Sequence, residues 1–315
     1  MYFPFIRGKQ FDLIALKEST NTIIENGKIL PIIEPVNLKN YVLRSFERFI
    51  ETNMPFILII NPTEGSLINR RDSIKTEIIE NIIDEYDNFY VGFIITSRST
   101  IKDVTDFLEE YSNNKVCFIH YTPFQNVDNL INKINEYNNI VYQIFYDGHL
   151  NAGYISRFVD NNKVLLKDEF SKENRNADYT QEEYYSNLYK EYRNRGFIGF
   201  GDFSIIGDYY IESAGPANAV AIHYTYINEQ DDDNLWIKHF VSDDTEGPEN
   251  ILGKFSQALG KYVNFLNGYT PGHAEQCSGC SDFLDLYGRS HFPGLASVKK
   301  ISLKHHIKLI SELIS

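Results

Sequence analysis

The sequence predicts a (β/α)8 TIM-like barrel of the α/β class with a C-terminal helical appendage that carries Cys and His residues. Three observations lead to this prediction. Eight short apolar runs recur between residues 28 and 224. Segments with helical periodicity separate most of these runs. After residue 249 the pattern changes to helices around a stretch rich in Gly, Cys, His and Ser. Strands and helices that alternate in this way are typical of a parallel barrel.

The eight apolar runs have the length of strands. They are continuous rather than alternating, which is typical of strands that are buried on both faces of a parallel sheet. The predicted strands cover residues 28–36, 56–61, 90–96, 116–121, 140–147, 163–167, 197–202 and 219–224.

The segments between the runs repeat apolar residues three and four positions apart. Residues 38–51 place Val42, Phe46 and Phe49 on one face, and residues 72–86 repeat isoleucines in the same way. Further helices are expected over 100–111 and 126–137. Such stripes pack against a sheet and leave the polar face in solvent.

Two places depart from the barrel pattern. Residues 203–218 show no helical periodicity, and the acidic turn at 229–234 lies between two apolar runs, 219–228 and 235–242, that can form a hairpin. A doubly wound open sheet with a hairpin at its edge is therefore the alternative architecture. Within the turn, the run Asp231-Asp232-Asp233 is interpreted as solvated, because three adjacent side chains do not converge on one metal ion.

The organisation that follows from this pattern has two parts. Residues 1–242 form the predicted barrel and residues 243–315 the appendage, with helices over 249–265 and 298–314. The appendage has little apolar mass of its own, so we expect it to dock on the barrel.

Charge and composition limit the classes of partner. Asp and Glu number 43 against 30 Lys and Arg, a net charge of -13. An acidic surface repels phosphate backbones, which argues against broad nonspecific nucleic-acid binding. The opening residues lack the charged and apolar pattern of a signal peptide, and the apolar runs are shorter than the roughly 18 residues of a membrane helix. We therefore expect a cytoplasmic protein without a membrane contact.

Short patterns are spread over essentially the whole chain. They are Tyr2-Phe3-Pro4-x-x-Arg7-Gly8-Lys9-Gln10, Pro31-Ile32-Ile33-Glu34, Lys167-Asp168-x-Phe170, Asn176-Ala177-Asp178-Tyr179, Gly199-Phe200-Gly201-Asp202, Ala219-Val220-Ala221-Ile222-His223 and His305-His306. Together they resemble the phage beta-protein family, which is scattered through phages and bacterial mobile islands. The resemblance implies a role in phage biology or anti-phage defence and includes no catalytic signature. In that context we expect a protein partner that is encoded nearby. Whether the protein forms an oligomer stays an open question.

Functional residues of such a barrel lie at the C-terminal ends of its strands. The candidates for catalysis are Glu34, His120, Asp168, Asp202 and His223, and the candidates for substrate binding are Arg7, Lys9, Asn61, Arg98, Asp147 and Lys167. Carboxylates can hold a divalent metal ion, His can transfer a proton and Arg can bind an anion, which suits hydrolysis of a phosphodiester or nucleotide. The alternative interpretation is that these are polar side chains satisfied within the core, as every barrel has.

One triad of candidates is expected to converge. Asp202 and His223 end the predicted strands seven and eight, and Glu34 ends the first strand, which closes the ring beside the eighth. Side chains that leave adjacent strands on the same face can meet, because neighbouring strands lie about 4.8 Å apart. His120 and His223 each follow an apolar run, so a buried neutral imidazole explains either of them equally well.

Two further motifs have both a structural and a functional interpretation. Arg7 and Lys9 can close over an anion, or the aromatic residues around them can plug the barrel while the basic groups face solvent. Gly199 and Gly201 permit close approach by a ligand or by another strand.

The most specific local arrangement is His273-x3-Cys277-x2-Cys280. Cys-x-x-Cys presents two thiolates from one turn, and His273 with His291, His305 or His306 can complete a tetrahedral structural zinc site. Reduced cysteines without a metal are the alternative, because no second Cys-x-x-Cys pair is present.

The function expected from these features is that of a barrel hydrolase acting on a phosphate-containing substrate. The alternative is a non-catalytic recognition or assembly subunit that binds a partner protein or phage component through the barrel mouth. A concave mouth that gathers Glu34, Asp202 and His223 favours the enzyme, and a flat apolar mouth favours the subunit.

Overall fold

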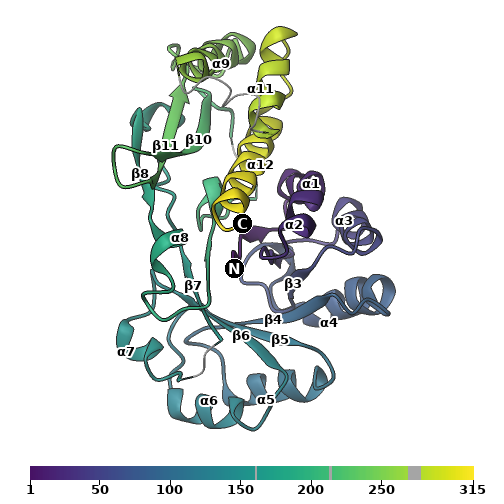
Figure 1. Ribbon diagram of the computed structural model, residues 1–315. Helices are drawn as coiled ribbons and strands as arrows, with labels where there is room; N and C mark the ends of the chain where they lie inside the picture. The colour runs from purple at the N-terminus through teal and green to yellow at the C-terminus, as the bar shows by residue number, and fades with distance from the viewer. Residues whose placement is uncertain (160–161, 213–214, 269–277) are drawn as a thin grey trace.

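The computed structural model, shown in Figure 1, describes residues 1–159, 162–212, 215–268 and 278–315. Its main sheet pairs eight parallel strands in the order β1-β2-β3-β4-β5-β6-β7-β9. These strands are β1 (Phe5–Arg7), β2 (Ile32–Glu34), β3 (Phe56–Ile59), β4 (Phe89–Ile95), β5 (Val116–His120), β6 (Ile140–Tyr146), β7 (Lys163–Lys167) and β9 (Gly199–Asp202). The sheet curves into a nearly closed barrel with helices between its strands, which confirms the predicted fold class.

Helices cover the outside of the barrel, and those over 40–51, 71–83, 101–110 and 127–134 follow the predicted segments. They are α1 (Gln10–Glu18), α2 (Thr20–Asn26), α3 (Asn40–Glu51), α4 (Arg71–Ile74) with the π-helix η2 (Lys75–Ile83), α5 (Ile101–Glu110), α6 (Val127–Ile134), α7 (Ala152–Ile155) and α8 (Leu188–Glu191). Three short 3₁₀ turns are η1 (Gly65–Leu67), η3 (Asn176–Asp178) and η4 (Ser204–Ile206). Helix α5 is capped by Thr100, which forms a capping box with Asp103. None of the helices built from the described residues is both long and apolar enough to cross a membrane.

The N-terminal segment supplies the closing strand of the barrel. Tyr2 forms parallel bridges to Ile29 and to Phe200 of β9, and the Phe3 amide donates to the Phe200 carbonyl at 2.8 Å. The approach is close: a Cβ on Gly201 would lie 2.2 Å from the Phe3 carbonyl oxygen. Glycine at this position of β9 therefore permits another strand to approach, which is one of the two interpretations offered by the sequence.

The prediction that residues 219–224 form the eighth barrel strand is wrong. They belong to β10 (Ala221–Asn228), which pairs antiparallel with β11 (Asn234–Val241), and β11 pairs with β8 (Glu182–Ser186). A parallel strand needs a crossover of a dozen or more residues, whereas antiparallel strands need only a short turn. The turn here holds Asp232 and Asp233 at positive φ, and Asp231 accepts from the indole of Trp236 at 2.9 Å. The hairpin of the alternative architecture is therefore confirmed, but the doubly wound open sheet is not, because the hairpin belongs to a separate sheet beside the barrel.

The barrel strands separate two apolar layers. Inside the barrel lie side chains such as Phe3, Phe5, Ile57, Ile144 and Leu166. Side chains that alternate with them pack outward against the helices. Along each strand, side chains alternate between facing inward and facing outward, and we call this direction the parity of a position. The parity of the last residue of a strand therefore decides whether its side chain reaches the mouth of the barrel.

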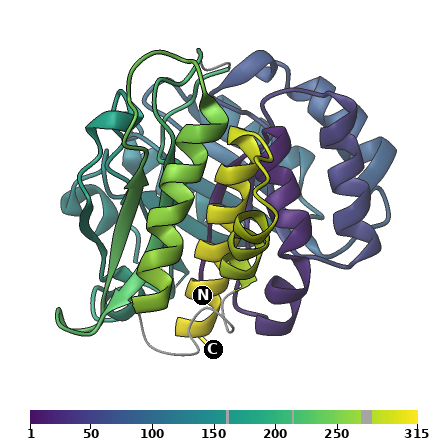
Figure 2. The ribbon, with the colours of Figure 1, turned by 90° about the horizontal axis from the view of Figure 1, so that it is seen from above.

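A second core joins the small sheet to the C-terminal helices α9 (Ile251–Gly268), α11 (Ser278–Gly288) and α12 (Leu295–Leu313). Ile222, Tyr224 and Phe240 of the hairpin pack with residues of α9 and α11. The predicted boundary at 242/243 thus falls between strands and helices that share one core. Figures 1 and 2 show α12 running from α9 to the N-terminal segment of the barrel, and its Leu303, Ile307 and Ile310 belong to the outer barrel core.

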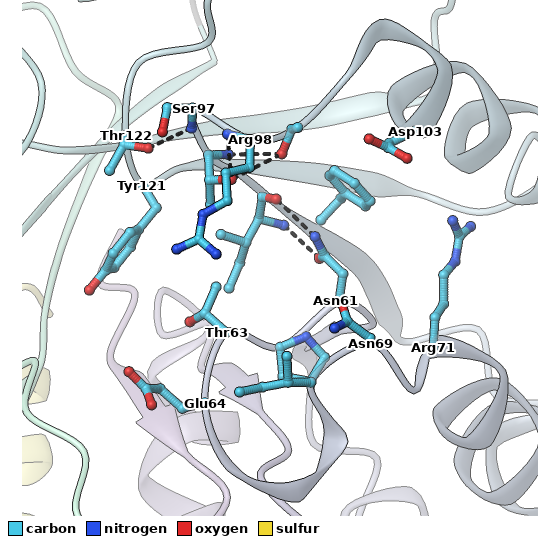
Figure 3. Close-up of a pocket in the computed structure, with 16 residues that line it drawn as sticks. Asn61, Thr63, Glu64, Asn69, Arg71, Ser97, Arg98, Asp103, Tyr121 and Thr122 are labelled. Carbon is cyan, nitrogen blue, oxygen red and sulfur yellow. Dashed lines mark hydrogen bonds between the residues drawn. The ribbon is translucent and has the colours of Figure 1, made fainter.

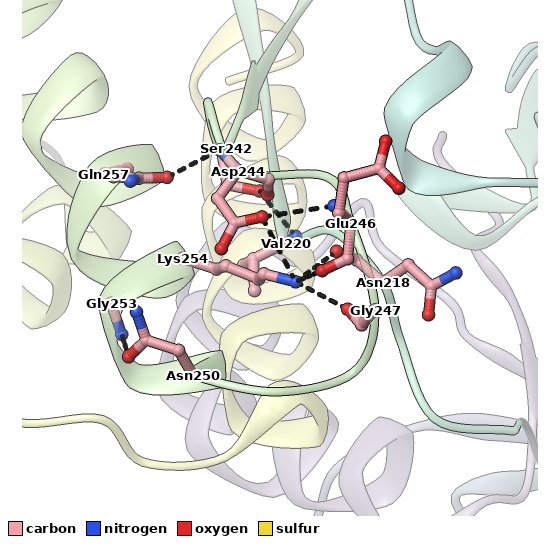
Figure 4. Close-up of polar contacts among 10 residues, drawn as sticks. All are labelled: Asn218, Val220, Ser242, Asp244, Glu246, Gly247, Asn250, Gly253, Lys254 and Gln257. Carbon is pink, nitrogen blue, oxygen red and sulfur yellow. Dashed lines mark hydrogen bonds and ion pairs between the residues drawn. The ribbon is translucent and has the colours of Figure 1, made fainter.

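Lys254 of α9 connects this helix to two loops, as Figure 4 shows. Its side chain is fully buried. Its Nζ donates to the carbonyl oxygens of Asn218 at 2.7 Å, Glu246 at 2.7 Å and Gly247 at 2.6 Å, and lies 3.7 Å from Oδ1 of Asp244. One ammonium group thus satisfies backbone acceptors from both sides of the hairpin.

Candidate functional site

A buried ionic network occupies the mouth of the barrel. Arg7, at the end of β1, lies with its Nε 3.3 Å from Oε2 of Glu34 at the end of β2, and its Nη2 donates to Oδ1 of Asp208 at 2.5 Å. Asp208 comes from the loop after β9. The three side chains are 5%, 0% and 10% exposed, so the two carboxylates are removed from water together with their cation.

Neighbouring strand ends complete the network. Oε1 of Glu34 accepts from the backbone N–H and the hydroxyl of Thr63 at 2.6 Å and 2.8 Å. Oδ2 of Asp208 accepts from the hydroxyl of Tyr121, after β5. Asp168, after β7, accepts from the backbone N–H of Asp208 at 2.8 Å. The loop after β9 is therefore held over the mouth by groups from across the barrel.

Burial changes the titration of these groups. It raises the pKa of Glu34, against the opposing effects of Arg7 and Thr63, and it raises the pKa of Asp168. Burial and then the hydrogen bond to Asp208 raise the pKa of Tyr121, so its hydroxyl stays protonated at neutral pH. Burial opposes the charge of Arg7, but the carboxylates of Glu34 and Asp208 outweigh it and raise its pKa. Perturbed groups that gather at one site are typical of functional sites, although structural ion pairs produce them too.

Beside this network lies an open pocket of about 720 Å³ over the ends of β3, β4 and β5, shown in Figure 3. Its wall includes Thr63 and Tyr121, so the network reaches the pocket at two points. The amide of Asn61 bonds both the N–H and the carbonyl of Ile94 at 2.8 Å, which fixes the floor. The other polar side chains of the wall are Glu64, Asn69, Arg71, Thr96, Ser97, Arg98, Ser99, Asp103 and Thr122.

Arg98 is the exposed cation of this pocket. In Figure 3 its guanidinium points into the pocket between Thr63 and Tyr121. No carboxylate of the described chain forms an ion pair with it, whereas the second arginine of the wall, Arg71, pairs with Glu110. Glu64 lies across the pocket from Arg98. The pocket therefore presents a cation and a carboxylate to one concave space.

Several predicted site residues do not face the mouth. His120 points outward, where its Nδ1 lies 3.0 Å from the hydroxyl of Tyr154 and its Nε2 lies 2.7 Å from Oε1 of Gln143. Burial lowers the pKa of His120 to about 4. These contacts are those of a neutral core imidazole.

Two other strand-end candidates form ion pairs close to their own strands. Asp147 pairs with Arg195 at 3.1 Å, and Lys167 pairs with Glu169 at 2.8 Å. Both occupy outward-facing positions, because the residues that precede them, Tyr146 and Leu166, face the inside of the barrel. Of the eleven candidates named for the mouth, Arg7, Glu34 and Asp168 belong to the buried network, and Asn61 and Arg98 line the adjoining pocket.

Asp202 and His223 do not converge with Glu34, so that part of the prediction is wrong. Asp202 shares the outward parity of Phe200, and its Oδ2 lies 3.2 Å from Nε2 of His306 on α12. Its Oδ1 accepts from the hydroxyl of Tyr2 at 2.7 Å and from the N–H of Ser204 at 2.9 Å. Asp202 thus joins the N-terminal segment, β9 and α12.

We expect Asp202→Asn to lower the free energy of unfolding by about 1–3 kcal/mol, because the amide leaves the Tyr2–Asp202–His306 contacts imperfectly paired. Asp147→Asn removes an aspartate from a partly exposed pair and is expected to cost less than about 1 kcal/mol. Urea denaturation of both variants measures the difference. An Asp202→Asn protein as stable as the parent would contradict this structural role.

His223 lies in the small sheet. Its Nδ1 is 2.7 Å from Nδ1 of His239, and its ring packs edge-on against Phe170 and Tyr179. Burial, followed by His239, lowers the pKa of His223. One Nδ1 must donate to the other, so at least the accepting imidazole is neutral. Burial also lowers the pKa of His239 to about 4, so both rings are neutral at neutral pH. This placement puts His223 outside the mouth network.

The proposed zinc ligands are only partly within the described residues. His273 and Cys277 lie outside them. Cys280 is buried in α11 and disulfide-bonded, so its sulfur is not a free thiolate here, and Nε2 of His305 lies 2.6 Å from the carbonyl oxygen of Thr225. Within the described ranges, no group of three or more His, Cys, Asp and Glu side chains is placed to hold a metal ion. The structural zinc and the divalent metal at the mouth stay predictions.

Sequence reasoning missed Thr63, Glu64, Tyr121 and Asp208, and also the pocket-wall residues Asn69, Arg71, Thr96, Ser99, Asp103 and Thr122. Thr63 and Glu64 follow the predicted strand 56–61, and Tyr121 is the last residue of the predicted strand 116–121, so extending the search over each strand end and a few loop residues would have found them. Asp208 lies in 203–218, the segment that was recognised as a loop at a strand end.

Comparison with known proteins adds no relative. The chain matches no protein-family model, and no curated protein or solved structure is detectably similar to it.

Proposed function

We propose that the protein binds a small molecule carrying a phosphate group in the pocket over β3, β4 and β5, and hydrolyses it there. The observation that supports binding is Arg98, whose guanidinium points into a concave polar pocket without a carboxylate partner among the described residues. A planar guanidinium matches the geometry of phosphate oxygens. The hydroxyl and amide groups around it offer further donors.

The hydrolytic step is supported by Glu64. Its carboxylate lines the same pocket and has no hydrogen-bond or ion-pair partner within the described residues. A carboxylate opposite an arginine can accept the proton of a water whose oxygen bonds to the phosphorus atom. The P–O bond to the ester group breaks in the same step, and the leaving alkoxide takes up the proton held by Glu64. Arg98 then neutralises the charge that develops on the phosphate oxygens. The buried network of Arg7, Glu34 and Asp208 holds the wall in place.

Two variants separate binding from catalysis. Arg98→Gln is expected to weaken phosphate-ester binding at least tenfold, which corresponds to about 1.4 kcal/mol. Glu64→Gln is expected to retain binding and to lower turnover by about 10²–10⁴, as removal of a general base does. Calorimetry with nucleotides and assays with p-nitrophenyl phosphate and its diester measure the two effects.

The control is Arg157→Gln, an exposed arginine paired with Asp128 away from the pocket. Turnover that is equal in Glu64→Gln and the parent would overturn the hydrolytic step. Ligand binding without turnover in the parent would favour the alternative function, a recognition subunit. The resemblance to the phage beta-protein family leads us to propose a role in phage–host conflict, which plaque assays with the same variants test.

A further inference from the structure

A second cavity, of about 310 Å³, lies between the barrel and the small sheet. Three lysines from separate parts of the chain line it: Lys9 after β1, Lys172 after β7 and Lys299 on α12. The loop after β9 supplies Tyr209 and Glu212, and β10 supplies His223. None of these residues lines the pocket that contains Arg98.

The charges of this cavity are poorly balanced. Within the described residues, neither Lys9 nor Lys172 forms an ion pair with a carboxylate. Lys9 donates to the carbonyl oxygen of Ile211, and Nζ of Lys172 lies 3.6 Å from the centre of the Tyr209 ring. Lys299 lies 3.4 Å from Oδ1 of Asp12. Glu212 lines the cavity without forming an ion pair with any of the three.

The lysines also act on one another. Burial, followed by Lys299 and Lys9, lowers the pKa of Lys172 to about 8, and burial and then Lys299 lower the pKa of Lys9. In a chain with 43 acidic and 30 basic residues, three cations converge where carboxylates are scarce. An anion in the cavity would relieve this repulsion.

An independent observation points to a ligand. Ser302 of α12 lines the same cavity and is 1% exposed. Its Oγ has no hydrogen-bond partner among the described residues. A buried hydroxyl without a partner is costly, and a ligand oxygen in the cavity would satisfy it.

We propose that the cavity bounded by Lys9, Lys172, Lys299 and Ser302 is a second anion-binding site that takes a multiply charged phosphate group of a small molecule. Lysine ammonium groups bind phosphate as point charges, and three of them match a group of two or three negative charges. The volume lies at the lower end of the range of about 300–1,000 Å³ for small-molecule sites, so the ligand is compact.

Inorganic pyrophosphate is the probe, titrated by calorimetry at constant ionic strength into a protein that carries Arg98→Gln. This background removes the cation of the barrel pocket, so the result does not depend on the proposed function. We expect saturable binding with one equivalent per chain. In this background, Lys172→Gln should weaken pyrophosphate binding at least tenfold. Lys172→Arg, made separately in the same background, should keep most of the affinity.

Two further variants make the test specific. Ser302→Ala should weaken binding severalfold, because it removes the unpaired hydroxyl. Lys102→Gln should leave binding unchanged, because Lys102 of α5 is 78% exposed and does not line the cavity. Equal affinities of the background protein and its Lys172→Gln variant would overturn the site, as would no binding at millimolar pyrophosphate.

Discussion

Replacement of Arg7 by Met is expected to lower the free energy of unfolding by about 3–5 kcal/mol, the cost of removing one partner of a buried ion pair. Arg7 faces two buried carboxylates, Glu34 and Asp208, and it is their only basic ion-pair partner in the part of the chain that the structure describes. Without it, Glu34 keeps its bonds to Thr63 but has no opposing charge. The carboxylates of Glu34 and Asp208 are then two buried negative charges without a cation.

The loss of unfolding free energy caused by Arg7→Met should depend on pH in a defined direction. Burial already raises the pKa of Glu34 above its usual value of 4.5, and loss of Arg7 removes a group that lowers it. A carboxyl with a raised pKa in the folded state destabilises the protein above that pKa, and protonation relieves the penalty as the pH falls. The difference in stability between Arg7→Met and the parent should therefore shrink between pH 7 and about pH 5.

Urea denaturation at several pH values measures this behaviour. Arg157→Met removes an exposed Arg–Asp pair and is the matched control, with an expected cost below about 1 kcal/mol. The double variant Arg7→Met/Glu34→Gln should recover part of the lost stability, because the stability effects of substitutions at contacting residues are not additive. A deficit that is the same at pH 5 and pH 7 would contradict the assignment to Glu34.

The fold could be predicted from the sequence because the barrel strands are continuous apolar runs, a local property of the chain. The exception is the closing strand. The segment from Tyr2 to Arg7 is short and directly precedes a helix, so nothing local distinguishes it from a plug. Its place beside β9 depends on the close approach permitted by Gly201, a contact between residues about two hundred positions apart.

The site was harder to predict, because the position at a strand end does not determine which way a side chain faces. Glu34 and Asp168 share the inward parity of their strands and reach the mouth network. His120 ends β5 and Asp202 ends β9 of the same barrel, but both face outward, where they contact Gln143 and His306. In a strand buried on both faces, apolar residues stand on either side, so the pattern does not mark the inner face.

Replacement of Lys254 by Met is expected to destabilise the second core by about 3–5 kcal/mol, comparable to the loss of Arg7. Methionine fills a similar volume but donates no hydrogen bond. The carbonyl oxygens of Asn218, Glu246 and Gly247 would then be left without the ammonium group that they share. Each unsatisfied buried acceptor costs about 1–3 kcal/mol, and water entering the site offsets part of this.

The location of the damage separates this prediction from a general loss of stability. Lys254 contacts the loops on both sides of the hairpin, so hydrogen exchange should accelerate most in β10 and α9, while the barrel strands β3–β6 keep their protection. Lys261→Met is the control on the same helix: Lys261 is 43% exposed and contacts Asp243 and the carbonyl of Val241. Because water can replace those contacts, its cost should stay below about 1 kcal/mol. Equal effects of the two substitutions would show that the three buried carbonyl groups are satisfied without Lys254, and that the second core does not depend on this ammonium group.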